Sequence, residues 1–171
     1  MPIYALGERT PTIDPTAFVH PDAVVIGDVR IGAQSSIWPT AVLRGDYGTV
    51  IVGMRTSIQD GAVVHAVADY PTIIGDDCVV GHLAHLEGCV IHDRALIGSG
   101  SIVLHEAVVH SGATVGAGAV VRNRMVVPAN SLAVGVPATI KPDVSGEESI
   151  LENAASYVAN AERYREGLRR I

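Results

Sequence analysis

Large aromatic side chains are nearly absent from this chain. Only 4% of its 171 residues are aromatic, although 48% are hydrophobic. A core of this kind must be assembled from small repeated layers, and the length fits a single domain. With 18 glycines and 9 prolines, the composition does not suit a helical bundle, yet it falls short of a low-complexity or collagen-like chain.

An excess of basic residues is also missing. The chain has 12 lysines and arginines against 18 acidic residues, which gives a formal net charge of −6. An acidic protein attracts neither nucleic acid nor an anionic membrane, so neither is expected as a partner. No apolar run is long enough to span a bilayer, and Met1–Glu8 lacks the pattern of a secretion signal. We therefore expect a soluble, cytoplasmic protein.

Cysteine is scarce. Cys78 and Cys89 are the only two, and neither belongs to a Cys-x-x-Cys zinc pattern. A disulfide between them is conceivable, but without a secretion signal small buried thiols are favoured.

What the chain does contain is an aliphatic residue that recurs every six positions. A small residue stands two positions before most of them, and Gly, Asp or Asn follows many. A period of six matches neither a helix nor simple strand alternation, and it is typical of a short strand followed by a tight turn. The recurring positions are Ile13, Val19, Val25, Ile31, Ile37, Leu43, Val52, Ile58, Val64, Ile74, Val80, Leu86, Ile91, Ile97, Val103, Val109, Val115, Val121 and Val127.

Three such units close one triangular coil, and coils stack into a prism. The aliphatic side chains fill the inside, and the small residues let the chain turn at the corners. Adjacent coils pair at about 4.8 Å, which satisfies the backbone groups. The sequence thus predicts a mainly β protein, a parallel β-helix of hexapeptide repeats over residues 13–140, with an N-terminal lead-in at residues 1–12.

A C-terminal helix is predicted after the last repeat. Apolar residues follow at spacings of three and four, which indicates an amphipathic helix from about Glu147 to Arg169 within a segment 145–170. Ser145-Gly146-Glu147-Glu148 has the pattern of a capping box. The apolar side of the helix is expected to pack on the outside of the prism, although a role in joining protomers is an alternative.

The six-residue register slips at three places. Nine residues separate Leu43 from Val52, ten separate Val64 from Ile74, and five separate Leu86 from Ile91. Insertions at the corners of a solenoid often build its functional surface. The chain between the first and last of these slips collects histidines, carboxylates and an arginine, and it is the candidate site.

Counting faces by the register places Leu43, Val64 and Leu86 on one face of three consecutive coils. The residues that follow them, Arg44, His65 and Glu87, must then stack and point outward, close enough for adjacent levels to share one metal ion. His85 also points outward. His82 falls near Gln59 on a different face, so a metal site that uses it needs a second protomer, and a three-sided prism suggests threefold symmetry.

Single outward histidines are usually surface residues, and this is the expectation for His20, His92, His105 and His110. His65 and His82 are stronger candidates because they fall near Gln59, Asp60 and Arg44 beside a register break. Arg44 and Asp46 have an alternative role as an ion pair across a protomer interface.

These motifs resemble the γ-class carbonic anhydrase family of hexapeptide proteins over nearly the whole chain. The segments that carry the resemblance are Leu43-Arg44-Gly45-Asp46, Ser57-Ile58-Gln59-Asp60-Gly61 with His65, Val80-Gly81-His82, Gly88-Cys89, Ile97-Gly98-Ser99-Gly100 and Gly135-Val136-Pro137-Ala138. The last is shared with hexapeptide acyltransferases.

The resemblance implies a left-handed β-helix, a homotrimer and metal ions at subunit interfaces, each held by three histidines. His65 matches the first ligand and His82 the ligand given across the interface. The third ligand position holds Glu87, with His85 nearby as the other possible ligand. Gln59 matches the residue that orients the metal-bound hydroxide, and Arg44, Asp46 and Asp60 match interface and hydrogen-bonding residues. The acidic loop of the most active members has no counterpart here.

The function expected from this resemblance is hydration of CO₂ to bicarbonate by a metal-bound hydroxide. Zn²⁺ is the simplest metal, and Fe²⁺ or Co²⁺ fit imidazole ligands as well. A glutamate ligand would raise the pKa of the metal-bound water, which predicts weak activity near neutral pH or none. Two alternatives stay open: a CoA-dependent acyltransferase with His85 or His105 as base, and a trimeric scaffold without catalysis.

Overall fold

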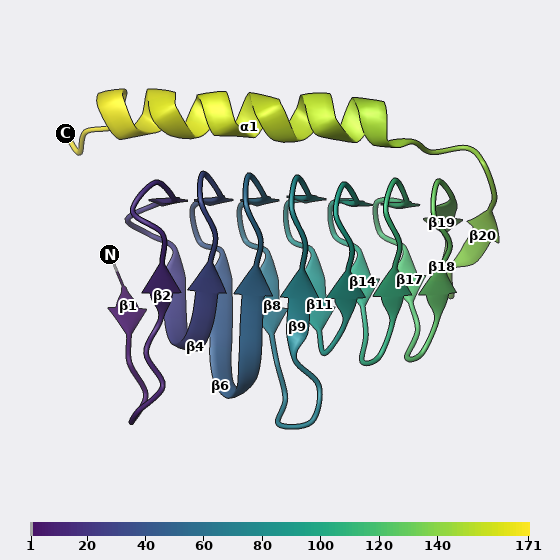
Figure 1. The fold of residues 1–171 in the computed structure, drawn as a ribbon, viewed down its shortest axis with the longest axis horizontal. Helices are drawn as coiled ribbons and strands as arrows, with labels where there is room; N and C mark the ends of the chain where they lie inside the picture. Colours follow the sequence, from purple (N-terminus) through teal and green to yellow (C-terminus); the bar gives the residue numbers. More distant parts are fainter. Residues whose placement is uncertain (1) are drawn as a thin grey trace.

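The computed structural model describes residues 2–171, and its elements stack into one triangular prism with a helix along one side (Figure 1). The strands are β1 (Ile3–Tyr4), β2 (Thr12–Ile13), β3 (Phe18–Val19), β4 (Val24–Ile31), β5 (Ser36–Ile37), β6 (Val42–Val52), β7 (Ser57–Ile58), β8 (Val63–His65), β9 (Thr72–Ile74), β10 (Val79–Val80), β11 (His85–Glu87), β12 (Val90–Ile91), β13 (Leu96–Ile97), β14 (Ile102–Val103), β15 (Val108–Val109), β16 (Thr114–Val115), β17 (Val120–Val121), β18 (Val126–Val127), β19 (Leu132–Val134) and β20 (Thr139–Lys141). The single helix is α1 (Glu147–Gly167). The predicted fold class, a parallel β-helix of hexapeptide repeats with a C-terminal helix, is confirmed.

The strands form three faces. One sheet has the order β20-β19-β16-β13-β10-β7-β5-β3 and makes the face on which α1 packs, here called the helix face. The second sheet covers the other two faces because β4 and β6 run through a corner: the start of β6 pairs with β8 and its end pairs with β9. We call the face with β8, β11, β14 and β17 the site face, and the face with β9, β12, β15 and β18 the third face.

The interior follows the predicted repeat. Leu43, Val64 and Leu86 are paired on consecutive coils and fully buried. Small residues such as Ala62 and Ala84 are buried at the corners. The expectation of buried, unpaired thiols is confirmed as well, because Cys78 and Cys89 are free and lie inside the core.

The corners use left-handed backbone conformations more widely than the glycine pattern suggests. Leu83 has φ 59° and Arg55 has φ 52°, although bulky residues rarely adopt positive φ. Each is held by a hydrogen bond to the neighbouring coil: the Leu83 N–H donates to Asp60 O at 2.9 Å, and the Arg55 N–H donates to Ala33 O at 2.9 Å. Stacking therefore enforces a conformation that the isolated residue disfavours.

The helix packs along the prism as expected, and it contacts β3, β5, β7 and β10. Ile150, Ala154 and Ala161 are its buried residues. Between α1 and the prism lies an aromatic cluster in which the ring of Trp38 is 5.5 Å from Phe18, 5.1 Å from Tyr164 and 5.9 Å from Tyr157. The rare rings of this sequence thus concentrate where the helix meets the coils.

The predicted capping box is wrong. Gly146 is the N-cap in an extended conformation, and no side chain caps the helix. Ser145 is held instead by the last coils: its hydroxyl lies 2.7 Å from that of Thr114, and its N–H donates to Asn130 O. The helix also ends at Gly167 rather than Arg169, because Leu168 is extended. Within residues 2–171, no helix is long and apolar enough to cross a membrane.

The stacked core predicts a large loss of stability when one inward residue is truncated. Ile91 is only 1% exposed, so Ile91→Ala should lower the free energy of unfolding by about 2–5 kcal/mol in urea denaturation. Leu151→Ala on the outer side of α1 is the control and should change it by less than about 1 kcal/mol. Equal losses for both variants would contradict the assignment of Ile91 to the core.

The buried thiols predict a loss of stability at alkaline pH. Burial raises the pKa of both Cys78 and Cys89 to about 12, whereas an unfolded thiol titrates near about 8.5. Their contribution is complete below about pH 8.5 and is lost as the pH rises toward about 12. The double variant Cys78→Ala/Cys89→Ala should therefore lose less stability between about pH 8.5 and 10.5 than the natural chain, as measured by urea unfolding. Identical slopes would refute this origin.

Candidate functional site

The predicted column on the site face is present. Arg44 pairs with His65, and His65 pairs with Glu87, on three consecutive coils. Because the residues before them point inward, these three side chains point out of the same face. The bend of β6 brings Asp46 back toward this column.

His65 lies between two carboxylates. Its Nε2 is 2.9 Å from Asp46 Oδ1, and its Nδ1 is 2.8 Å from Glu87 Oε1. Arg44 makes a further ion pair with Asp46 in the same chain. The His65 side chain is only 11% exposed, so this group is largely shielded from water. We call Arg44, Asp46, His65 and Glu87 the site-face cluster.

The two carboxylates of the site-face cluster are stabilised in their charged form. Burial by itself raises the pKa of Asp46, but hydrogen bonds from His65 and Arg44 outweigh it and hold that pKa below its usual value. Burial acts on Glu87 in the same way, and hydrogen bonds from His65 and His85, with the charge of His65 and His105, lower its pKa overall. Both groups are therefore anionic near neutral pH.

Two more histidines approach Glu87. His85 Nε2 lies 3.4 Å from Glu87 Oε2, and His105 Nε2 lies 3.7 Å from the same oxygen. His105 is not the free surface histidine that was expected, because its Nε2 is buried without a hydrogen-bond partner and its ring lies 6.0 Å from that of Tyr70. His20, expected outside, is also buried, at 9% exposure.

Asp60, His82 and Gln59 form a second group at the corner between the helix face and the site face. His82 Nδ1 is 3.0 Å from Asp60 Oδ2, and both side chains are about half exposed, at 51% and 47%. The predicted separation of His82 from His65 within the chain is confirmed: Asp60 and Gln59 lie with His82, whereas Arg44 lies with His65. The face assignment made from the register explains this separation.

Gln59 is 4% exposed and lines a hollow of about 290 Å³ beside His82. Tyr157 and Asn153 of α1 and Ser99 of the next coil complete its polar lining. Burial, and then the negative charge of Asp60, raise the pKa of Tyr157. The register could not place α1 here, so sequence reasoning missed Tyr157 and Asn153.

The donor set suits a metal only in part within one chain. Imidazole and carboxylate are zinc ligands, and His65 and Glu87 are adjacent. Among residues 2–171, however, no three His, Cys, Asp or Glu side chains converge on one metal position.

Comparison with known proteins gives a consistent picture. The model of the bacterial transferase hexapeptide family (six repeats) matches residues 71–105 and 88–123. The carnitine operon protein CaiE of Citrobacter koseri is 45% identical over 148 residues, which cover 86% of this chain and 75% of the relative. CaiE of Escherichia coli K12 is 42% identical over 148 residues, with coverages of 86% and 76%.

Two solved structures are similar over almost the entire chain. A proposed acetyltransferase from Bacillus cereus superposes with a TM-score of 0.92 at 37% identity and covers 95% of this chain and 96% of its own. A hexapeptide transferase family protein from Anaplasma phagocytophilum has a TM-score of 0.89 at 36% identity, with the same coverages.

The position of His65 predicts a structural role that is independent of catalysis. His65→Ala would leave two anionic carboxylates without their shared partner, so the free energy of unfolding should fall by about 1–3 kcal/mol at pH 7. His92→Ala, at an exposed position, is the control and should change it little. A urea denaturation series in which both variants match the natural chain would contradict the contacts of His65.

Proposed function

Because this chain belongs to the hexapeptide-repeat family that includes the carnitine operon protein CaiE, we propose that it hydrates CO₂ to bicarbonate at a metal site shared between copies of the chain. The observation that carries the proposal is the division of the donors: His65 and Glu87 are stacked at one place, and His82 stands beside Gln59 at another corner. One copy thus offers two donors to a neighbour that supplies the third.

A homotrimer is part of the proposal, and the uncovered faces support it. The outward positions on the site face and the third face are mostly aliphatic and partly exposed, whereas α1 already covers the helix face. Covering these aliphatic columns with a second copy of the chain removes apolar surface from water, which stabilises the assembly. The aliphatic residues are Val42, Val63, Ile102 and Val120 on the site face and Ile51, Ile73, Val90, Val108 and Val126 on the third face.

The residues that would hold the metal are His65 and Glu87 of one copy and His82 of the next, with His85 as the alternative to Glu87. When bound, Zn²⁺, Fe²⁺ or Co²⁺ lowers the pKa of a water molecule so that it can attack CO₂. His65 can offer Nε2 only if Asp46 releases it, and Arg44 is placed to keep the freed carboxylate paired.

The other residues orient these donors and the substrate. Asp60 accepts the Nδ1 proton of His82, which leaves Nε2 of that ring as the free donor atom. Gln59 lines the adjacent hollow, where its amide can hydrogen-bond the substrate. The partly buried ring of Tyr157 covers one side of the same hollow. A nearby histidine or buffer would carry the released proton away.

Glu87 sets the expected pH range of this activity. A carboxylate in place of a neutral imidazole adds negative charge, which raises the pKa of the activated water and weakens hydration near neutral pH. Activity should therefore increase toward alkaline pH.

A second candidate, acyl transfer from a CoA thioester, is favoured by one contact. His105 Nε2 is buried 3.7 Å from Glu87 Oε2, so a carboxylate orients a histidine that could act as general base. The similar Bacillus cereus structure is also described as a proposed acetyltransferase. This reaction needs Glu87 and His105 but does not need His82 or a metal.

Metal content and subunit mixing test the first candidate. About one metal per chain is expected in elemental analysis after zinc reconstitution. His65→Ala, His82→Ala and Glu87→Ala should each lose it, while His85→Ala keeps it. Because the donors come from different copies, trimers that mix His65→Ala and His82→Ala chains should regain part of the metal and of the CO₂ hydration at alkaline pH.

The same variants separate the alternatives. Metal lost on His85→Ala but kept on Glu87→Ala would move the third ligand to His85. Metal-free protein that consumes acetyl-CoA, with loss of this activity in His105→Ala, would overturn hydration in favour of acyl transfer. Neither metal nor thioester consumption would leave a scaffold.

A further inference from the structure

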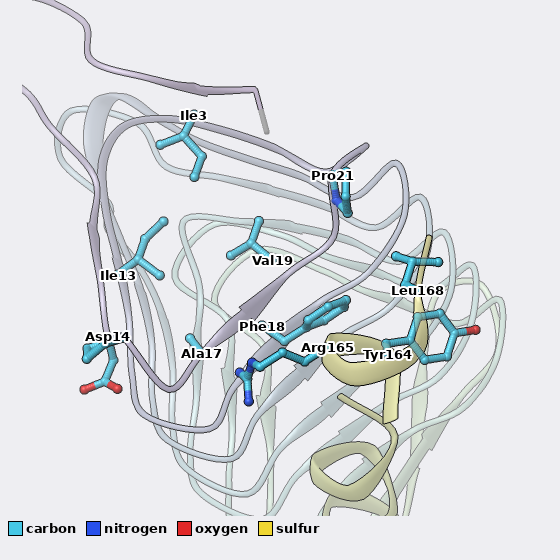
Figure 2. Close-up of a pocket in the computed structure, with 11 residues that line it drawn as sticks. Ile3, Ile13, Asp14, Ala17, Phe18, Val19, Pro21, Tyr164, Arg165 and Leu168 are labelled. Carbon is cyan, nitrogen blue, oxygen red and sulfur yellow. The ribbon is translucent and has the colours of Figure 1, made fainter. Parts of the chain in front are cut away.

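The N-terminal end of the prism carries a cavity that the proposed function does not use. It has a volume of about 500 Å³, within the usual range of small-molecule sites. Figure 2 shows Ile3 of β1, Ile13 of β2 and Val19 of β3 on one side, and Tyr164 of α1 with Leu168 just after the helix on the other. It shares no lining residue with the hollow beside Gln59 and His82.

The cavity lies where the coils of the described residues begin. Inner residues of a solenoid are normally covered by coils on both sides, whereas within residues 2–171 only the lead-in precedes Ile13. The lead-in strand β1 pairs with β4 and leaves Ile13 and Val19 facing the opening. The walls are therefore mainly aliphatic and aromatic. Burial of an apolar chain against them would be favourable, because it removes apolar surface from water.

Positive charge gathers beside this cavity. Arg163, Arg165, Arg169 and Arg170 are four of the 12 lysines and arginines of an otherwise acidic chain, and all lie among the last nine residues. Arg169 and Arg170 line a neighbouring hollow of about 340 Å³ together with His20, Asp22 and Leu168. Leu168 lines both spaces, so the apolar cavity opens toward the arginines.

The existing contacts of the charged residues around the cavity indicate where the charged group of a ligand would lie. Asp14 at the rim accepts hydrogen bonds from Thr16 N and Oγ1, which lower its pKa and keep it anionic. Arg165 is held by Glu162 and donates to Thr16 O at 2.8 Å. Within residues 2–171, neither Arg169 nor Arg170 is ion-paired with a carboxylate. A negative group would thus turn away from Asp14 toward these two arginines.

We propose that this end of the prism binds a monomeric amphipathic anion, a medium-chain aliphatic carboxylate. Its chain fills the cavity lined by Ile3, Ile13 and Val19, and its carboxylate lies at Arg169 and Arg170.

The fluorescence of Trp38 provides the readout. It is the single tryptophan, and its ring lies 5.5 Å from Phe18 and 5.1 Å from Tyr164, both of which line the cavity. Titration of the full chain with octanoate below its micellar concentration should give a saturable change with one site per chain. Affinity should rise about fourfold for each methylene from hexanoate to octanoate. Octanol should bind several-fold more weakly than octanoate because it lacks the charge.

Two variants test the two halves of the site separately. Ala17→Leu narrows the cavity and should weaken octanoate at least tenfold, while the matched Ala155→Leu, at an exposed position on α1, should leave it unchanged. Arg169→Gln/Arg170→Gln should remove the preference for octanoate over octanol and keep octanol binding. The double arginine variant changes no core residue. It therefore tests the proposal even if circular dichroism shows that Ala17→Leu does not fold.

Three results would overturn the proposal. One is a fluorescence change that does not saturate. Another is octanoate affinity that is the same in the double arginine variant. The last is co-sedimentation with phosphatidylglycerol vesicles without any response to monomeric octanoate, which would assign the charge to a lipid surface instead.

Discussion

The register between successive coils determines almost everything else in this molecule. Each short strand pairs with the strand one coil away, so an inward residue fixes the direction of its neighbours through the whole column. The Leu43–Val64–Leu86 column is the clearest example, since its burial places Arg44, His65 and Glu87 on top of one another. The same pairing holds Leu83 and Arg55 in left-handed conformations that neither residue favours alone. The position of a side chain in this fold is determined more by pairing between coils than by the local sequence.

This dependence explains which features could be predicted from the sequence. The six-residue period identifies the inward positions, and counting along it assigns the polar residues to faces, so the stacking of Arg44, His65 and Glu87 and the separation of His82 were both predicted correctly. Periodicity carries no information about contacts between a corner and a helix distant in sequence. The positions of Tyr157 and Asn153 in the hollow beside Gln59 were therefore not predicted. The failure of the predicted capping box has the same cause, because the Ser145 hydroxyl bonds to Thr114 of a distant coil instead of capping the helix.

His105 was misjudged for a related reason. Its side chain does point outward, but the ring of Tyr70 packs beside it, and the carboxylate of Glu87 on the preceding coil lies near its Nε2. A side chain that points out of the prism is exposed to solvent only where the neighbouring corner loops are short. Where an insertion such as the segment after His65 folds over the surface, an outward side chain can be partly covered, as His105 is with 31% of its side chain exposed. The sequence signal for this is the longer spacing from Val64 to Ile74.

Glu87 links these observations to chemistry. An imidazole at this position would leave His65 with Asp46 as its one acidic neighbour, whereas a carboxylate binds His65 at 2.8 Å and draws His85 and His105 toward it at longer range. A group with two oxygens can serve two directions at once: Oε1 faces His65, and Oε2 faces the other two rings. Its charge is already satisfied by hydrogen bonds in the isolated chain, so a metal must displace existing partners before it can bind. Such competition lowers metal affinity relative to a site whose ligands have no other partners, and it makes the choice between metal binding and orientation of a histidine depend on which contacts a second copy of the chain adds.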